Sequence, residues 1–508
     1  MKHSGKSFHL LTLSPRGDPM PRGELADAFL LDLEFMPPFQ HRSEVTAGKV
    51  TLPVPDEPFA ICMPLPVEGF GHVYVYADNQ GAGYKPAEVA GRTLNFLLEA
   101  ADARAAAVGA AEGRFADTGT EPSSDYRERM SSAQTILEDA RRRRADDVVC
   151  TQLATRSLAA SMHAGELLVL EHARARIAAS GRRQGFRFGC NAFRYPGMRD
   201  PYAAAFRGLF NFATLPFYRS QTEAEEGVRD FSKAEQILEW AAREGLEVKG
   251  HPLVWFHRGG VPDWLRGRSY EEVSATHRDY ISDAVGRFRD PIKVWDVINE
   301  AHDWANDLSY SADQLTEMTR LAAQATREAD PEAVRIVNCT ETWGQYVASG
   351  RGYAGEIGHP ARTALRYLRD IMEAGVDFEV IGLQMYSPQR DLFEIDRQLD
   401  RYGRLGKPMH ITELGVPSAT HFPQDHDNRE ALEKIMGRRW HGHPWSESEQ
   451  ADWVEGYYTL CYSKSTIEAI TWWDLCDPAF IPHSGLLDGA LREKEAYRRL
   501  ATLLRSWR

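Results

Sequence analysis

Two glutamates lie at the ends of apolar, strand-like runs in the second half of the chain. Asn299-Glu300 closes the run IKVWDVINE, and Thr412-Glu413 lies near the end of the run KPMHITEL. In a barrel of parallel strands, side chains at the carboxyl ends of the strands converge on one face. Two carboxylates on that face could protonate a leaving oxygen and attack an anomeric carbon, which is the pair that glycoside hydrolysis requires.

Aromatic residues cluster at the ends of the same apolar runs. Sugar rings have apolar faces that pack on aromatic rings, so such residues favour a carbohydrate site. They are Trp255, Trp295, Tyr386, Trp472 and Trp473. We interpret Trp295, inside its run, as a core residue, whereas Trp255 and Trp473 lie nearer strand ends and are candidates for substrate contact.

Eight apolar runs alternate with helical segments beyond about residue 185. The runs are FRFGCNAF (186–193), LFNFATLP (209–216), LEVKGHPLVW (246–255), IKVWDVINE (292–300), VRIVNC (334–339), FEVIGLQMY (378–386), KPMHITEL (407–414) and AITWWDL (469–475). This alternation predicts a parallel sheet, and eight repeats predict an α/β protein with a closed (β/α)8 TIM barrel. No GxGxxG or GxxxxGK[ST] motif occurs, so nucleotide-binding doubly wound folds lose support.

The region before the barrel divides into two parts. Residues 1–85 contain Pro, Gly and short apolar runs such as HVYVYAD, which predict a β-sandwich-like domain. Residues 86–182 form a helical connecting segment, with long helices predicted over 87–113 and 124–180. The catalytic barrel then takes 183–508.

Two features of this first region have competing interpretations. The basic run Arg141 to Arg144 is interpreted as a solvated helix face rather than a nucleic-acid patch, because the chain is acidic. The β-rich domain could be a carbohydrate-binding module or a structural cap. We favour the cap, since the helices leave no Gly/Ser/Pro linker of the kind that tethers a mobile module.

The composition is that of a globular protein with more than one domain: 508 residues, 43% hydrophobic and 26% charged. A net charge of −13 makes nucleic acid and anionic membranes poor partners, whereas a neutral poly- or oligosaccharide remains compatible. The six cysteines form no CxxC pair and are expected to be buried thiols. The HGH triplet at 441–443 lacks acidic or Cys partners at ligand spacing, so we expect no metal.

The chain start, MKHSGKSFHLLTLSPRGD, has no adequate apolar h-region and does not indicate a signal peptide. We expect a secreted or periplasmic protein if a leader has been removed, and a cytoplasmic one otherwise. No apolar run reaches the length of a membrane span.

From about residue 185 to 505 the chain resembles glycoside hydrolase family 10, the family best known for endo-β-1,4-xylanases. The family belongs to a clan with its acid/base and nucleophile on barrel strands four and seven. The matching stretches occur in family order: GHPLVW (250–255), WDVINEAHDW (295–304), IGLQMY (381–386), ITEL (411–414), ITWWDLCDP (470–478) and GLLDGALREKEAY (485–497).

The resemblance implies roles for the matching residues. Glu300 corresponds to the acid/base and Glu413 to the nucleophile, while Asn299 corresponds to the asparagine that holds the sugar's 2-hydroxyl. His251 and Trp255 match the residues that line the subsite next to the bond that is cut.

Two further residues match the family pattern, and two depart from it. Gln384 matches the glutamine after strand six, and Trp473 matches the tryptophan that forms the floor of the sugar site. The family usually has a histidine two positions after that glutamine, where this chain has Tyr386, and often an aspartate where this chain has Gly415. A tyrosine hydroxyl could hydrogen-bond the nucleophile and keep it ionised, so we expect Tyr386 to contact Glu413.

The residues expected on the glycone side of the cleft depart further from the family pattern. The family carries a Glu-Asn pair and a lysine after strand two, which hold the distal glycone sugar, but here the stretch is TLPFYR (214–219). Phe217 and Tyr218 could stack on a sugar or close the cleft. Phe256 and Phe480 replace a histidine and a tryptophan of the family and are expected to alter two other walls of the cleft.

The resemblance implies retaining hydrolysis of a β-linked glycan through a covalent glycosyl-enzyme, with no cofactor. Xylan is the family default, but the changed glycone side predicts weak activity on linear xylan and a preference for a decorated xylan, another β-glycan or a short glycoside. One alternative is a non-hydrolytic carbohydrate-binding protein, although such proteins usually lose a catalytic carboxylate. Another is a transglycosylase, which would use the same residues with a sugar as acceptor.

Overall fold

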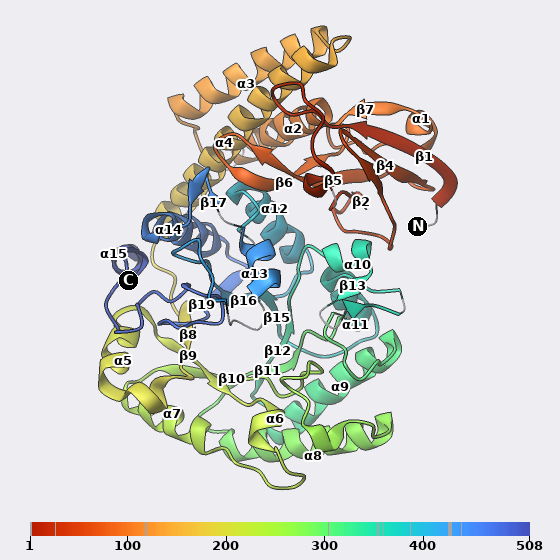
Figure 1. The fold of residues 1–508 in the computed structure, drawn as a ribbon. Helices are drawn as coiled ribbons and strands as arrows, with labels where there is room; N and C mark the ends of the chain where they lie inside the picture. Colours follow the sequence, from red (N-terminus) through yellow and green to blue (C-terminus); the bar gives the residue numbers. More distant parts are fainter. Residues whose placement is uncertain are drawn as a thin grey trace.

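The computed structural model describes residues 3–25, 27–116, 119–302, 304–352, 355–358, 360–386, 388–424, 429–437 and 439–507. Eight parallel strands close into a barrel (Figure 1). They are β8 (Arg187–Asn191), β9 (Phe212–Pro216), β10 (Glu247–His251), β11 (Val294–Asn299), β12 (Val334–Cys339), β15 (Val380–Gln384), β16 (Met409–Leu414) and β19 (Ile467–Trp472). Each of the eight predicted runs overlaps one strand, which confirms the predicted barrel. Their near-continuous apolar character follows from burial on both faces of the sheet.

Helices cover the outside of the barrel. The longer ones are α5 (Tyr195–Leu209), α7 (Ser232–Arg243), α8 (Tyr270–Phe288), α9 (Ala312–Ala329), α11 (Ala364–Glu373), α12 (Leu392–Gly403), α14 (Glu447–Ser463) and α15 (Glu495–Trp507). Local sequence determines where some of them begin: α8 starts with a capping box formed by Ser269 and Glu272, and α9 with one formed by Ser311 and Gln314.

Short elements lie in the loops after the strands. They are α6 (Arg219–Thr222), α10 (Gln345–Ser349), α13 (Arg429–Met436), the pair β13 (Arg351–Gly352) and β14 (Gly355–Glu356), the pair β17 (Arg439–Trp440) and β18 (His443–Pro444), and 3-10 turns at Arg22–Glu24 and Asp263–Leu265.

Two sheets form the N-terminal part. One has the order β3-β4-β1-β7 and the other β2-β5-β6. The strands are β1 (His3–Leu11), β2 (Phe29–Leu31), β3 (Glu44–Thr46), β4 (Lys49–Pro55), β5 (Ala60–Val67), β6 (Gly71–Ala77) and β7 (Thr93–Asn95). Phe8 and Leu52 of the first sheet share one apolar core with Met63 and Val75 of the second. Residues 93–95 pair with β1, so this sheet extends past residue 85.

The helical segment differs from the prediction in two places. Residues 87–92 do not begin a long helix, because α1 (Pro86–Val89) is followed by β7 and only then by α2 (Phe96–Ala116). The predicted helix over 124–180 is two helices, α3 (Ser124–Arg142) and α4 (Asp147–Ser180). Asp146 starts the second by accepting a hydrogen bond from the Val149 N–H, so the basic run lies at the end of α3 and in the turn.

The N-terminal part packs against the barrel. One face of the β2-β5-β6 sheet forms a separate apolar cluster with Ala348 of α10, through Phe29, Leu31, Cys62, Tyr74 and Tyr76. Arg104 of α2 forms a buried ion pair with Asp391 at the start of α12. Both contacts lie at βα loops of the barrel, on the face where the strands end.

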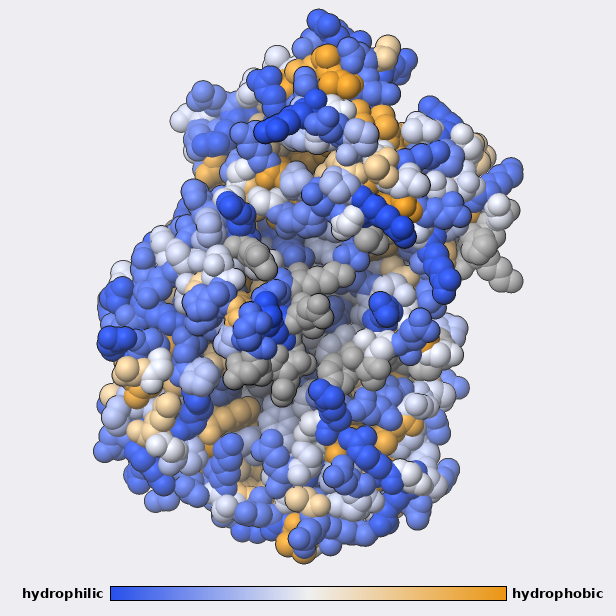
Figure 2. Space-filling model, viewed as in Figure 1, coloured by the Kyte–Doolittle hydropathy of each residue, from blue (hydrophilic) through white to orange (hydrophobic). Residues whose placement is uncertain are grey.

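Among the described residues, few large hydrophobic side chains are exposed; they are Leu33, Val148, Val228 and Phe480. Figure 2 shows a mostly hydrophilic face on which hydrophobic residues form small, scattered patches. Within the described residues, no helix combines the length and the apolar character needed to cross a membrane. All six cysteines are buried free thiols, as expected.

Candidate active site

The two candidate carboxyl groups lie at the carboxyl ends of barrel strands and are both buried. Glu413 is part of β16, and Glu300 directly follows β11. The backbone of Glu300 has φ of 57°, in the left-handed region that non-glycine residues rarely adopt. Its N–H donates to the Asn338 carbonyl at 2.8 Å, which holds this turn against the next strand. Such backbone strain is typical of functional sites.

Glu300 accepts hydrogen bonds from two predicted site residues. Trp255 Nε1 donates to Glu300 Oε2 at 2.8 Å, and Gln384 Nε2 donates to Glu300 Oε1 at 2.8 Å. Gln384 also donates to Asn299 Oδ1 at 3.2 Å. The carboxyl group is therefore held in one orientation from both of its oxygens.

Glu413 is held by a different set of side chains. As predicted, the Tyr386 hydroxyl donates to Glu413 Oε2, at 3.0 Å. His251 Nε2 lies 3.9 Å from Glu413 Oε1, and Asn338 Nδ2 lies 3.5 Å from the same oxygen. Thus the structure brings Tyr386, which replaces the family's histidine, into contact with the candidate nucleophile.

Asn338, near the end of β12, connects Asn299, which precedes Glu300, with Glu413. This residue was not identified from the sequence. It donates to Asn299 Oδ1 at 2.7 Å and accepts a hydrogen bond from Thr412 Oγ1 at 2.5 Å. It therefore fixes Asn299 relative to Glu413. Its place at the end of the run VRIVNC is the same strand-end signal that identified Glu300.

A buried ion cluster orients His251 and was also missed. Asp296 Oδ2 lies 2.6 Å from His251 Nδ1 and 2.7 Å from Lys249 Nζ. An ionised carboxylate can only accept, so His251 donates through Nδ1 and turns its Nε2 lone pair toward Glu413. The signal in the sequence was a charged residue inside each of two apolar strand runs.

The pKa values of both Glu300 and Glu413 are raised. Burial raises the pKa of Glu300 to about 7, and the negative charge of Glu341 adds to this, against the hydrogen bonds from Gln384 and Trp255. Burial is the main cause of this shift. Burial and the charge of Glu300 raise the pKa of Glu413 well above its ordinary value. The pair therefore retains a proton near neutral pH.

In the buried ion cluster, the pKa values of Asp296 and His251 are lowered rather than raised. Burial alone would raise the pKa of Asp296, but Lys249 and His251 hold it below its ordinary value. Burial lowers the pKa of His251, so its ring is neutral at neutral pH.

Three aromatic residues lie around the carboxyl pair. The ring of Trp473 lies 5.3 Å from that of His251, and the ring of Tyr218 lies 5.7 Å from that of Trp255. Phe480 is 46% exposed, with its ring 6.1 Å from that of Tyr386. Trp473 thus contacts a predicted site residue, and Tyr218 is a site residue that the sequence left open.

Two predicted cleft residues lie elsewhere. Phe217 is fully buried and packs on Phe288 and Trp295, so it cannot stack on a sugar. Successive side chains near a strand end point to opposite sides, which turns Phe217 outward into the layer between strands and helices and leaves Tyr218 at the cleft. Phe256 is also fully buried, with its ring 5.2 Å from that of Tyr310, and forms no cleft wall. Trp295 is fully buried, as expected.

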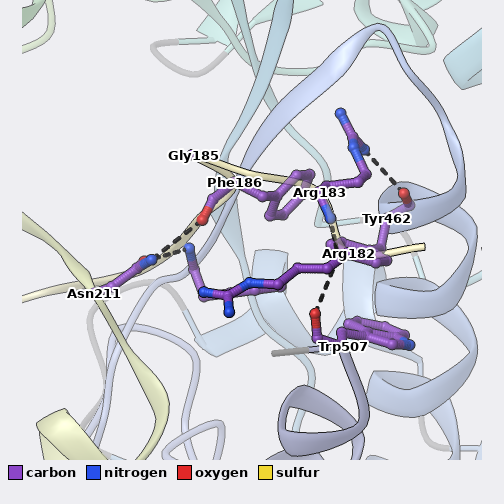
Figure 3. A pocket seen from close by; sticks show the side chains of 8 residues that line it. Arg182, Arg183, Gly185, Phe186, Asn211, Tyr462 and Trp507 are labelled. Carbon is purple, nitrogen blue, oxygen red and sulfur yellow. Dashed lines mark hydrogen bonds between the residues drawn. The ribbon is translucent and has the colours of Figure 1, made fainter. Parts of the chain in front are cut away.

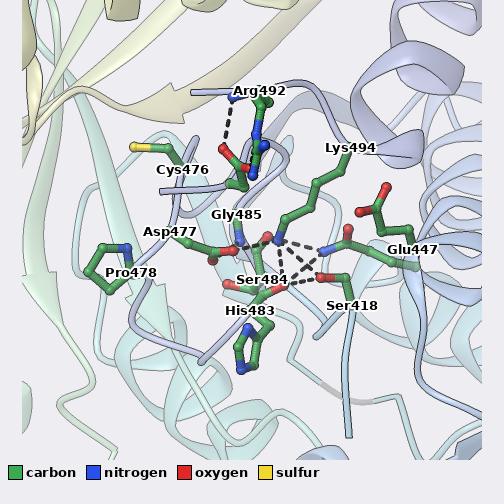
Figure 4. Close-up of polar contacts among 12 residues, drawn as sticks. Ser418, Glu447, Cys476, Asp477, Pro478, His483, Ser484, Gly485, Arg492 and Lys494 are labelled. Carbon is green, nitrogen blue, oxygen red and sulfur yellow. Dashed lines mark hydrogen bonds and ion pairs between the residues drawn. The ribbon is translucent and has the colours of Figure 1, made fainter. Parts of the chain in front are cut away.

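A polar clamp holds the loop after β19, which carries Phe480. Lys494 Nζ lies 2.5 Å from Asp477 Oδ2, 3.0 Å from Ser418 Oγ and 3.1 Å from the His483 carbonyl oxygen (Figure 4). The clamp therefore joins the loops that follow β16 and β19, the strands that carry Glu413 and precede Trp473.

A recess of about 120 Å³ lies at the opposite end of the barrel, near the start of β8 (Figure 3). Arg183, one of the residues that line it, donates to the carbonyl oxygens of Tyr462 and Lys464, both at 2.9 Å. The guanidinium thus connects the chain before β8 to the turn before β19. Residues at this end of a barrel usually serve stability, so the recess is not a second candidate for catalysis.

The sequence also matches a known family. The model of glycosyl hydrolase family 10 matches residues 217–502. The chain belongs to glycosyl hydrolase family 10. It is thus a glycoside hydrolase, and the first 216 residues lie outside the family match.

Several curated relatives of this family 10 enzyme are xylanases. Endo-1,4-β-xylanase B of Thermotoga neapolitana is 26% identical over 303 residues, which are 58% of this chain and 78% of that protein. Endo-1,4-β-xylanase B of Paenibacillus barcinonensis is 26% identical over 268 residues, 49% of this chain and 71% of that protein. The crystal structure of native xylanase 10B from Thermotoga maritima is 23% identical, covers 63% of this chain and 95% of its own, and has a TM-score of 0.48.

Within the described residues, no group of three or more His, Cys, Asp or Glu side chains could hold a metal ion. The candidate site consists instead of two carboxyl groups with their hydrogen-bond donors and aromatic neighbours, which is the composition that acid–base and nucleophilic chemistry on a sugar requires.

Proposed function

We propose that this family 10 enzyme hydrolyses a β-linked glycan with retention of configuration, with Glu300 as acid/base and Glu413 as nucleophile. The observation that carries the proposal is the contrast between the two buried carboxyl groups. Glu300 accepts N–H bonds from Trp255 and Gln384, whereas Glu413 accepts an O–H bond from Tyr386. Each carboxyl group therefore has its own environment, as two different roles require.

The first step forms a covalent glycosyl-enzyme. Glu300 gives its proton to the glycosidic oxygen as the bond to the anomeric carbon breaks, and a Glu413 oxygen forms the new bond to that carbon. Asn299 Oδ1 already accepts from Asn338 and Gln384, so its Nδ2 is the group that can donate to a sugar hydroxyl next to the reacting carbon.

The second step releases the sugar. Glu300, now ionised, takes a proton from water as the water oxygen attacks the anomeric carbon, and the bond to Glu413 breaks. The product has the original configuration, Glu300 is protonated again, and Glu413 is again a carboxylate. A sugar hydroxyl in place of water would give transglycosylation through the same residues.

The substrate class follows from the relatives, several of which are endo-1,4-β-xylanases. We propose a xylan-type or related β-glycan, and weak activity on unsubstituted linear xylan. The support is the glycone side, where Tyr218 follows β9 and the family's Glu-Asn pair is absent. Buried polar groups that find no partner cost affinity, so substrates that rely on that pair lose more than others.

Two variants test the roles of the carboxyl groups. Glu413→Gln should abolish activity on every substrate. Glu300→Ala should retain more activity on aryl glycosides with good leaving groups, because these need little protonation. Azide should rescue Glu300→Ala with retained configuration, measured by NMR of the glycosyl azide. An inverted product would contradict the retaining mechanism, and full activity of Glu413→Gln would contradict catalysis at this site.

We also propose that the N-terminal part is a structural cap of the barrel rather than a separate binding module. The support is burial: one sheet face packs on α10, and Arg104 is an ion-pair partner of the α12 start. A tethered module would instead expose both surfaces. A carbohydrate-binding role would be supported if the isolated sheets bound a polysaccharide.

A further inference from the structure

Four aromatic rings close on one another beside Glu413. Going round this four-ring cluster, the ring centroids are 5.3 Å apart from His251 to Trp473, 5.7 Å to Phe193, 6.0 Å to Tyr218, and 5.5 Å back to His251. Each ring meets the next nearly edge-on, at angles between 76° and 84°. Edge-to-face rings at these distances are in contact, so no sugar ring fits between neighbours in the cluster.

Phe193 is the member of the cluster that the sequence did not single out, and the structure holds it firmly. Its N–H donates to Asn191 Oδ1 at 3.4 Å, and Asn191 Nδ2 donates to Asp474 Oδ1 at 3.2 Å. The next residue, Arg194, donates to the Pro478 carbonyl oxygen at 3.0 Å. The segment after β8 is thereby joined to the segment after β19, and the Phe193 ring contacts both Tyr218, which lies after β9, and Trp473, which follows β19.

The chemistry of the proposed function determines which substrate unit lies at this cluster. The sugar that forms the covalent bond lies beside Glu413, and the leaving group lies toward Glu300. His251 Nε2 is 3.9 Å from Glu413 Oε1, so the cluster borders the first glycone sugar. A longer glycone would continue from that sugar toward the non-reducing end, past the position after β9 where the family holds its distal sugar. Tyr218 stands there, in contact with Phe193.

Two further observations mark this place as the end of the cleft. Lys233, an exposed residue, has its ammonium nitrogen 5.8 Å from the Phe193 ring centroid, so Phe193 lies near the surface of the protein. In the part of the chain that the structure describes, the Tyr218 hydroxyl forms no hydrogen bond, although its ring contacts both His251 and Trp255. That hydroxyl is available to a hydroxyl of the first glycone sugar.

We propose that Phe193 and Tyr218 close the glycone end of the cleft behind a single sugar, so that the enzyme removes single sugars from the non-reducing ends of β-linked oligosaccharides. This inference rests on the proposed function and narrows its substrate class. Tyr218 contributes a hydrogen bond to the terminal sugar, and Phe193 blocks the path of a second one.

The decisive measurement compares 4-nitrophenyl β-xyloside and β-glucoside with the corresponding 4-nitrophenyl xylobioside and cellobioside. For the wild type we expect kcat/KM for release of nitrophenol to be at least about tenfold higher on the better monoside than on its bioside, the scale on which one well-placed contact discriminates. With reducing-end-labelled xylopentaose and cellopentaose, the first labelled product should be the tetramer. Early labelled mono-, di- or trisaccharides would overturn the inference.

Two variants and a control separate closure from general damage. Phe193→Ala should raise kcat/KM on the bioside and lower the monoside preference about tenfold, since it opens the blocked path. Tyr218→Phe keeps the ring, so it should lower kcat/KM on both substrates about tenfold without changing their ratio. Phe480→Ala, at the other wall of the cleft, should leave the ratio unchanged. Thermal unfolding checks that each variant is folded.

The outcomes also distinguish this inference from the proposed function. If the wild type is inactive on all four aryl glycosides and both oligosaccharides, the proposed function and the inference both fail. If it is active, loses that activity in Glu413→Gln, but prefers biosides or keeps its ratio in a folded Phe193→Ala variant, the function stands and the closed glycone end is wrong.

Discussion

At the scale of single residues, the site depends on how each carboxyl group is held. Tyr386 donates to Glu413 Oε2 at 3.0 Å, and this bond lowers the pKa of Glu413 against burial and the charge of Glu300, which raise it. The tyrosine therefore favours the ionised form that the nucleophile needs, and takes the place of the family's histidine at this position.

Tyr386→Phe tests this role. We expect kcat to fall by roughly ten- to a hundredfold, because the nucleophile loses a positioning hydrogen bond. The pKa of Glu413 rises without the donor, so the acidic limb of the kcat/KM profile should move to higher pH. A rate–pH series on one aryl glycoside measures both effects. An unshifted acidic limb would show that the hydroxyl does not act on Glu413.

The raised pKa of Glu300 makes the stability of the folded protein depend on pH. Its pKa is about 7 in the folded protein and 4.5 for an ordinary glutamate, so folding favours its protonated form. Its contribution to stability is complete below pH 4.5 and is lost as the pH rises through 7. The difference corresponds to about 3 kcal/mol, which is the stability that the native carboxyl group gives up at alkaline pH.

Glu300→Gln removes this dependence, since the amide does not titrate. We expect the variant to become more stable relative to the wild type as the pH rises from 4.5 to 7, with little further change above. Urea unfolding of both proteins over that range measures the difference, in which titrations of groups remote from Glu300 cancel. A constant difference at all pH values would contradict the raised pKa.

At the scale of elements, loops rather than strands set the shape of the cleft. The loop after β19 carries Phe480, and Lys494 at the start of α15 holds it through Asp477. The ion pair is largely buried, so removal of one partner leaves the other charge without compensation.

Lys494→Met should lower the free energy of unfolding by about 3 kcal/mol and raise KM, because the loop is released while Glu300 and Glu413 stay in place. Arg492→Met is the matched control. Arg492 forms an ion pair with Asp488 in the same segment, but it is 82% exposed, so its loss should cost well under about 1 kcal/mol. Thermal unfolding and a Michaelis curve for each variant measure these effects; equal losses in both would refute the clamp.

At the scale of the whole molecule, the N-terminal part and the barrel share a buried interface. Arg104 Nη1 and Nη2 donate to the two oxygens of Asp391 at 2.9 and 2.8 Å, and Glu394 lies 3.2 Å away. Glu166 of α4 accepts the Leu392 N–H at 2.8 Å, so a second helix of the N-terminal part holds the same turn. This turn leads from β15, which carries Gln384, into α12.

Arg104→Met should destabilise the molecule by about 3–5 kcal/mol, because Asp391 remains buried without its cation and Glu394 is left with its ion pair to Arg397. We expect one cooperative unfolding transition for the wild type by calorimetry, and a lower Tm for the variant. Arg141→Met, which removes the more exposed Arg141–Asp102 pair, is the control with little expected effect. Independent melting of the N-terminal part in the wild type would contradict the cap.

The sequence alone determined the barrel and the two carboxyl groups, because both leave local signals. A buried parallel strand appears as a short apolar run, and Glu300 and Glu413 lie at or next to the last position of such runs. Tertiary structure decided which side chains meet. Pairing of β10 with β11 places Asp296 beside Lys249 and His251. Closure of the barrel then brings His251 of β10 to Glu413 of β16, which lies across the barrel.

The residues after β9, on the glycone side, show most clearly the difference between what local sequence determines and what tertiary structure decides. Phe217 and Tyr218 are adjacent aromatic residues with the same sequence signal, yet one is buried against Trp295 and the other faces the cleft. Local sequence does not encode that choice, since it depends on how the chain turns after β9. Phe193, far from both in the sequence, reaches Tyr218 only because β8 and β9 are neighbours in the closed sheet.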